Sequence, residues 1–211
     1  MDYPRSIQSA AARMMPRAVA ALCLATALLA AAVLPLSAAS EPANPAARTD
    51  GALPPVTLMD QNGAAVPLAS LRGRPVLLGF VHTSCKGPCE MMTAKMKLVG
   101  DKLVSHHDIK LVMVTVTTDP DHDGPAQMLA YAKAQNANQP GWLFLSGKPS
   151  DVRRVLAVYN IPQDESEEDE MTHVLDLFLI APDGTTVRKY HGIEISPETI
   201  ASDIRKTLAR R

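Results

Sequence analysis

The chain has 211 residues, 46% of them hydrophobic, and its formal net charge at pH 7 is −1. A chain of this length fits one domain plus a leader, and its apolar fraction is sufficient for a hydrophobic core. The balanced charge, without a long basic run or basic residues interleaved with aromatic ones, excludes nucleic acid as an expected partner.

Residues 1–39 have the composition of an export leader. Three arginines precede residues 18–36, an almost wholly apolar stretch without charge, and a small-x-small pattern suited to signal peptidase follows it. We therefore predict that residues 1–39 are a signal peptide. An uncleaved membrane anchor is the alternative, because residues 18–39 just reach the length of about 20 apolar residues that a bilayer requires. In either case we expect the rest of the chain to be exported, either periplasmic or anchored to the membrane and facing the periplasm.

Residues 40–55 are rich in proline and alanine and lack periodicity, which is typical of a flexible tether. From residue 56 the hydrophobic pattern becomes regular and predicts one domain, residues 56–211. Strands are predicted at 56–59, 65–68, 75–81, 109–116, 142–145, 174–180 and 185–190. Helices are predicted at 90–103, 125–137, 150–159 and 197–208, the last of them capped by Ser196.

The order of these elements predicts the fold class. Alternating strands and helices indicate an α/β domain, in which a central, mostly parallel sheet is flanked by helices. Residues 75–81 form a continuous apolar run, as expected for a central strand that is buried on both faces. Together with the N-terminal β-hairpin, the closing hairpin and helix, and a cysteine pair directly after residues 75–81, this order predicts a thioredoxin-like fold.

Cys85 and Cys89 follow the first central strand, at the edge of the sheet where ligands bind in open α/β folds. Pro88 fits the first turn of the next helix, so Cys89 is expected near a helix N-terminus, which favours a thiolate. A separation of four residues lets the two sulfurs meet one metal ion or each other. In an exported protein the pair therefore indicates either a disulfide-forming dithiol or a soft-metal site.

An imidazole from another strand end would complete a soft-metal site with the two thiolates. His173 precedes the predicted strand 174–180, which we expect to lie close to the first central strand, so its ring is expected over the cysteine loop. His82, three residues before Cys85, is a substitute ligand, although a structural role is its simpler interpretation. Four further histidines are expected to be exposed, namely His106, His107, His122 and His191.

Three features, in this order along the chain, resemble the SCO/SenC family. They are the Cys85-x-x-x-Cys89 loop, the Asp-Pro-x-x-Asp-x-Pro segment at 119–125, and His173, nine residues before the proline of a Pro-Asp-Gly turn. The resemblance runs from about Leu58 to the C-terminus. It implies a copper chaperone that helps to assemble the binuclear copper centre of cytochrome c oxidase, with Cys85, Cys89 and His173 as ligands of Cu(I) or Cu(II). It also implies a copper-receiving membrane oxidase subunit as partner.

The loop departs from the family pattern in one respect. Family members usually have proline directly after each cysteine, whereas this chain has Lys86 and Glu90 there, and its proline is Pro88. The resulting Gly-Pro-Cys ending resembles the second half of a thioredoxin loop. A thiol–disulfide oxidoreductase therefore remains the alternative, with Cys85 and Cys89 as the redox-active pair. It would act on cysteines of an exported or oxidase-subunit target, with a thiol reductant protein as a further partner.

Other polar residues near this edge are expected to be structural. Asp119 is predicted to form a turn and Asp123 to cap the helix 125–137. The acidic run 164–170 is predicted to be a solvated loop. Under the chaperone interpretation the protein is not an enzyme.

Overall fold

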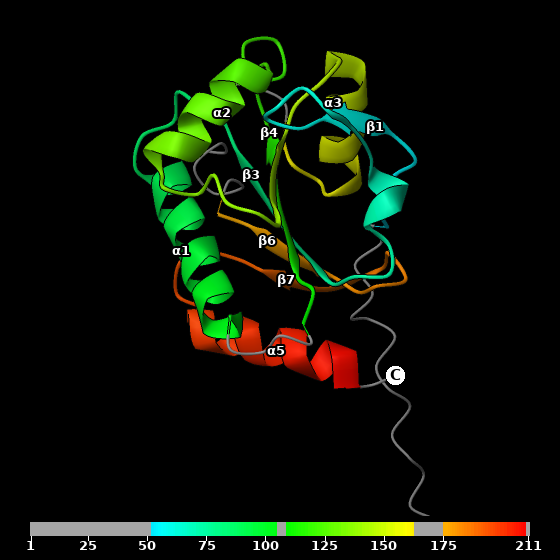
Figure 1. Ribbon diagram of the computed structural model, residues 1–211, viewed down its shortest axis with the longest axis vertical. Coiled ribbons are helices and arrows are strands. Elements are labelled where there is room, and N and C mark those ends of the chain that lie inside the picture. Colours follow the sequence, from blue (N-terminus) through cyan, green and yellow to red (C-terminus); the bar gives the residue numbers. More distant parts are fainter. Residues whose placement is uncertain (1–51, 105–108, 163–174, 210–211) are drawn as a thin grey trace, which may run out of the picture. The chain divides into compact units, whose positions relative to one another are not determined.

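The computed structural model describes residues 52–104, 109–162 and 175–209 (Figure 1). The chain separates into two units, Met1–Pro42 and Ala43–Arg211, and all the described residues belong to the second. The predicted leader, most of the predicted tether, and the acidic run 164–170 lie outside the described residues. Within the described ranges, no helix combines the length and apolar character needed to cross a bilayer.

A five-stranded sheet forms the centre of the domain, with the strand order β5-β4-β3-β6-β7. The strands are β3 (Val76–Val81), β4 (Val112–Thr117), β5 (Trp142–Leu145), β6 (Leu177–Ile180) and β7 (Thr186–Tyr190). Strands β3, β4 and β5 run parallel to one another, whereas β6 is antiparallel to both of its neighbours, β3 and β7. Because β3 lies between β4 and β6 and is buried along its whole length, its sequence is apolar throughout.

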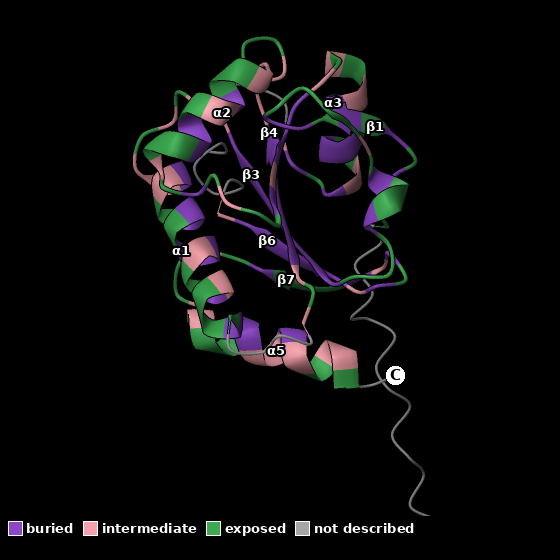
Figure 2. Ribbon diagram, viewed as in Figure 1, coloured by how far each residue is buried: buried purple, intermediate pink, exposed green. Residues whose placement is uncertain are grey.

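Helices cover both faces of the sheet and create two hydrophobic cores (Figure 2). The helices are α1 (Pro88–Leu103), α2 (Pro125–Ala134), α3 (Pro149–Val158) and α5 (Pro197–Ala209). Residues of α1, α2 and α5 share one core with Leu77 and Val81 of β3. Residues of α3 share the other with Leu78 and Phe80, the alternate residues of the same strand. The predicted α/β class is therefore confirmed.

The N-terminal hairpin, β1 (Thr57–Met59) and β2 (Ala65–Pro67), packs on the α3 side and continues into the 3-10 helix η2 (Leu68–Leu71). The sequence had indicated that Leu68 ends a strand. In the structure it instead begins this 3-10 helix. Helix α2 ends at Ala134, three residues before its predicted end, because Asn136 adopts a left-handed φ of 51° that stops the helix. Ser196 caps α5 as predicted, since its Oγ accepts the N–H of Thr199 at 3.2 Å.

The outer edge of β5 is covered by a side chain from the hairpin turn. Gln61 is buried, and its Oε1 accepts the backbone N–H of Phe144 at 2.9 Å. Its Nε2 donates to the carbonyl of Trp142 at 3.2 Å. Met59 and Ser146 extend this contact through a pair of backbone hydrogen bonds. The side-chain amide thus satisfies backbone groups that an edge strand would otherwise leave unpaired.

We predict that Gln61→Ala lowers the free energy of unfolding by about 1–3 kcal/mol, because it leaves two buried backbone groups of β5 without partners. Urea denaturation followed by circular dichroism measures the change. Gln127→Ala, on the exposed side of α2, is the matched control and should stay within about 0.5 kcal/mol. Equal stabilities of the two variants would contradict this account of the edge.

Candidate metal centre

The loop that joins β3 to α1, residues 82–87, carries the first cysteine and leads into the second. Here we refer to it as the cysteine loop. Gly87 precedes α1 with a φ of 88°, a conformation that side-chain-bearing residues rarely adopt, and its carbonyl accepts the N–H of Met91 at 2.9 Å. Pro88 is the first residue of the helix, as the sequence predicted. Cys89 is therefore the second residue of α1, beside its N-terminal N–H groups.

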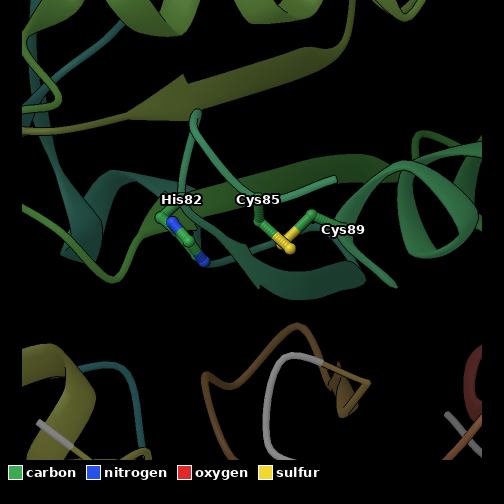
Figure 3. Close-up of side chains that lie close together, drawn as sticks. All are labelled: His82, Cys85 and Cys89. Atoms are coloured by element: carbon green, nitrogen blue, oxygen red, sulfur yellow. The ribbon is translucent and has the colours of Figure 1, made fainter. Parts of the chain in front are cut away.

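The cysteine loop brings three potential ligands together. The ligand atoms of His82, Cys85 and Cys89 all lie within 4.8 Å of one another, and among the described residues they form the one group of three His, Cys, Asp or Glu side chains with such a spacing. Figure 3 shows the two sulfurs adjacent to each other and the imidazole beside them. The loop makes a tight turn, in which the N–H of Cys85 donates to the carbonyl of His82 at 3.1 Å. No disulfide joins the two cysteines.

These separations suit a single soft ion. Metal–sulfur bonds of about 2.3 Å and metal–nitrogen bonds of about 2.0 Å allow two ligand atoms on one ion to be at most about 4.6 Å apart. A three-coordinate arrangement needs sulfurs about 4 Å apart on the same bond lengths. The three ligand atoms therefore need at most a small closure to share an ion. Two thiolates and an imidazole are the donor set of copper or zinc, whereas magnesium and calcium prefer oxygen.

Cys89 is fully buried, so its thiolate needs stabilisation by neighbouring dipoles. The N-terminus of α1 provides this, since its first N–H groups carry partial positive charge. A buried hydrogen-bond chain holds the same turn, because Thr93 Oγ1 donates to the carbonyl of Cys89 at 2.9 Å. The single hydroxyl proton of Thr93 is used there, so the Tyr131 hydroxyl donates to Thr93 Oγ1 at 2.8 Å. Burial raises the pKa of Tyr131, and this keeps its hydroxyl protonated as the donor.

A buried carboxylate fixes the other end of the cysteine loop. Asp123 is 3% exposed, and its Oδ2 accepts the backbone N–H of Thr83 at 3.0 Å and the hydroxyl of Thr117 at 2.8 Å. Its Oδ1 accepts the hydroxyl of Thr83 at 2.5 Å. We call these three residues the Asp123 clamp. It joins the cysteine loop to the end of β4, where a further bond runs from the N–H of Thr118 to the carbonyl of Val81 at 2.8 Å.

The clamp corrects the prediction that Asp123 caps α2. Gly124 occupies the N-cap position and no side chain caps the helix there, because the Asp123 carboxylate is directed to the two threonines. The predicted turn at Asp119 is confirmed, since its carbonyl accepts the N–H groups of His122 and Asp123. Thr83 and Thr117 were not predicted as partners of Asp123, although the sequence shows both as hydroxyl residues at the ends of apolar strands.

The predicted ligand His173 lies outside the described residues, as do His106 and His107, so the predicted proximity of His173 to the cysteines stays a prediction. His122 is 81% exposed, as expected, and its Nδ1 contacts Asp119. The side chain of His191 is largely exposed, but its Nδ1 lies 2.7 Å from Oδ1 of Asp176, a fully buried carboxylate that also pairs with Lys189. Asp176 was not among the predicted functional residues, although the sequence shows it as a charged residue directly before an apolar run.

Comparison with known proteins places these residues in a family context. The family model for SCO1/SenC matches residues 45–209. The SCO1 protein homolog of Bacillus subtilis is 31% identical over 156 residues, which cover 72% of this chain and 80% of that protein.

Solved structures agree with the sequence match. Copper-bound ScoI of Bradyrhizobium japonicum is 28% identical with a TM-score of 0.60, covering 73% of this chain and 98% of that one. BsSco, a member of the Sco family of cytochrome c oxidase assembly proteins in which a disulfide switch has been identified, is 27% identical with a TM-score of 0.64. That match covers 76% of this chain and 95% of BsSco. The predicted thioredoxin-like fold is thereby confirmed.

We predict that Asp123→Asn lowers the free energy of unfolding by about 1–3 kcal/mol, because an amide group replaces a carboxylate oxygen that accepts hydrogen bonds from buried donors. Urea denaturation of the purified chain measures this loss. Asp121→Asn is the control in the same loop, since the ion pair of Asp121 with Arg153 is exposed and worth at most about 1 kcal/mol. The clamp would lose its assigned role if both variants unfolded at the same urea concentration.

Proposed function

This chain belongs to the SCO1/SenC family, and on that premise we propose that it is an exported copper chaperone for the assembly of cytochrome c oxidase. Cys85, Cys89 and His173 hold one copper ion, as Cu(I) or Cu(II), and the recipient is the membrane oxidase subunit that carries the binuclear copper centre. The observation that carries this proposal is the position of the two thiols, which lie side by side at the start of α1 within one metal's reach.

The donor set supports copper as the cargo. Thiolate and imidazole ligands suit soft ions, and a similar chain, ScoI of Bradyrhizobium japonicum, has copper bound. Cys85 is partly exposed whereas Cys89 is buried, so the ion is reached from the side of Cys85. Three protein ligands leave a coordination position for a thiolate of the recipient, and the ion can then pass through an intermediate in which both proteins share it.

The N-terminal segments support the proposed location of this transfer. In the proposal, residues 1–39 direct export as a cleaved signal or remain as an anchor through residues 18–39. Residues 40–55 are a tether, and residues 56–211 are the copper-binding domain. An anchored or periplasmic domain reaches a membrane oxidase from the side on which its copper centre is assembled.

The redox state of the cysteine pair controls loading. A disulfide between Cys85 and Cys89 would remove both sulfur ligands, so a thiol reductant protein is a further proposed partner. The similar protein BsSco has a disulfide switch.

The adjacency of the two sulfurs also favours a second function, thiol–disulfide oxidoreductase. The partly exposed Cys85 thiolate attacks a target disulfide and releases one target thiolate. Cys89 then attacks the sulfur of Cys85 and releases the second target thiolate. The Cys85–Cys89 pair ends as a disulfide, and the target has received two electrons.

Titration with Cu(I) tests the chaperone function. The reduced full-length chain, with Cys23→Ser so that only Cys85 and Cys89 of its three cysteines remain, is titrated against a competing chelator. We expect one Cu(I) ion to bind tightly per chain. Cys85→Ser or Cys89→Ser should lower the affinity for Cu(I) at least about 100-fold, because the loss of even an indirect partner of a metal site lowers metal affinity about 10–100-fold. His173→Ala should also weaken binding. A chain without a tight equivalent would contradict the proposal.

Oxidation separates the two functions. Treatment with a thiol oxidant should abolish copper binding by the same chain, and reduction should restore it, because the disulfide ties up both ligands. The oxidoreductase function predicts instead that the reduced chain cleaves insulin disulfides at a rate that His173→Ala leaves unchanged and Cys85→Ser abolishes. Tight copper binding without insulin reduction would exclude the second function.

A further inference from the structure

Two buried hydroxyl groups lie on the core side of the first turns of α1. Thr93 of α1 and Tyr131 of α2 are both buried, and Tyr131 packs in the same core as Cys89 (Figure 1). The Tyr131 hydroxyl donates to Thr93 Oγ1 at 2.8 Å, and Thr93 Oγ1 donates to the carbonyl of Cys89 at 2.9 Å. We call these two side chains the hydroxyl pair. Both of its hydrogen bonds are directed towards the backbone of a cysteine.

The hydroxyl pair gives the carbonyl of Cys89 a second donor. Within an α-helix, such a carbonyl already accepts the N–H of the residue four positions later. The extra hydrogen bond polarises the peptide group between Cys89 and Glu90, because hydrogen bonds in a chain strengthen one another. The N–H of that peptide group belongs to the first turn of α1, where N–H groups point towards the N-terminus and carry its partial positive charge. The hydroxyl pair therefore adds positive potential at the helix end that carries the cysteine pair.

The two hydroxyl dipoles act in the same direction. Each O–H bond points from α2 towards Cys89, so the positive ends of both dipoles face the start of α1. Burial raises the pKa of the Tyr131 hydroxyl, and negative charge on Cys89 and Cys85 raises it further. The hydroxyl therefore stays neutral when thiolates form and remains a donor. Packing alone requires neither oxygen, because phenylalanine and valine have nearly the same shapes as tyrosine and threonine.

We propose that the hydroxyl pair shifts the redox equilibrium of Cys85 and Cys89 towards the reduced state. Tyr131 and Thr93 are positioning residues in this scheme, since they act through the backbone of Cys89. A couple whose reduced form is stabilised is the more oxidising one, so its disulfide is reduced more readily. The consequence for copper loading, in which the sulfurs are kept available to the ion, rests on the proposed function.

The redox step uses a thiol reductant, for which glutathione is the probe. Two glutathione thiols supply two electrons, the sulfur–sulfur bond between Cys85 and Cys89 breaks, and one glutathione disulfide forms. The two protons that the glutathione thiols release pass to the cysteines or to water. The position of this equilibrium reports the stability of the reduced pair against the disulfide, and it is measured without any metal ion.

Equilibration in glutathione buffers tests the proposal. The full-length Cys23→Ser chain is compared with its Tyr131→Phe variant and with a double variant, Tyr131→Phe together with Thr93→Val. The double variant removes both hydroxyls, so neither is left buried without a partner. We expect its equilibrium constant for disulfide formation to rise at least about threefold, which is the scale of effects on charges at helix ends, and that of Tyr131→Phe to rise by a smaller factor. Acid quenching, thiol alkylation and mass spectrometry measure the oxidised fraction.

Thr115→Val is the matched control. Thr115 is a buried threonine of β4, and its Oγ1 accepts the indole N–H of Trp142 at 3.0 Å, so this variant also loses a buried hydrogen bond between a hydroxyl and an aromatic side chain. Its hydroxyl has no contact with the backbone of α1 that would act on the cysteines, and the equilibrium constant should stay unchanged. A purely structural effect of lost buried hydroxyls would instead appear in this variant too.

Three results would overturn the inference: an equilibrium constant of the double variant equal to that of the parent, a lower constant, or a shift of the same size in Thr115→Val. If circular dichroism shows that the double variant folds poorly, Tyr131→Phe decides by the same comparison. A separate Cu(I) titration of the parent chain distinguishes the two proposals. Absence of tight copper binding there contradicts the proposed function, whereas the redox effect of the hydroxyl pair is read from the glutathione equilibrium alone.

Discussion

The buried carboxylate of Asp123 is the interaction on which the arrangement of the candidate site depends. It accepts hydrogen bonds from Thr83 in the cysteine loop and from Thr117 at the end of β4. Buried charges are stable only when hydrogen bonds replace the lost water, and here three donors do so. The same bonds determine where the loop leaves the sheet. The positions of His82 and Cys85 follow from that, whereas Cys89 is placed by the start of α1.

The sheet and the helix define the remaining geometry. Strand β3 is buried along its length and ends where the loop begins, so the site lies at the carboxyl edge of the sheet between its two cores. Helix α1 packs on one of these cores and presents its N-terminus to the pair of sulfurs. The chain from Tyr131 through Thr93 to the carbonyl of Cys89 joins the first turn of α1 to α2. One cysteine is thus held by a helix and the other by a clamped loop.

Local patterns in the sequence predicted most of the fold and the proximity of the two cysteines. The apolar run of β3, the cysteine spacing and Pro88 each act through neighbours in the chain, and their consequences were predicted correctly. The partners of Asp123 were not, because Thr83 lies 40 residues away and competes with the helix N-terminus only once the strands are paired. His82 was predicted only as a substitute ligand, and its proximity to the cysteines depends on the tight turn to Cys85. His173 lies outside the described residues.

For the proposed function, the Asp123 clamp affects the rate at which a bound copper ion would be exchanged. Its hydrogen bonds are all made by protein groups, so the loop has its shape before any ion arrives. Small metal domains such as zinc fingers fold only when they are loaded, and release there is coupled to unfolding. In this chain, by contrast, unloading requires no reorganisation of the backbone around Thr83. Under the proposed copper-binding function, the dissociation rate is therefore set by the access of a competing ligand to the partly exposed Cys85, and such a site is suited to rapid transfer of the ion and not to its storage.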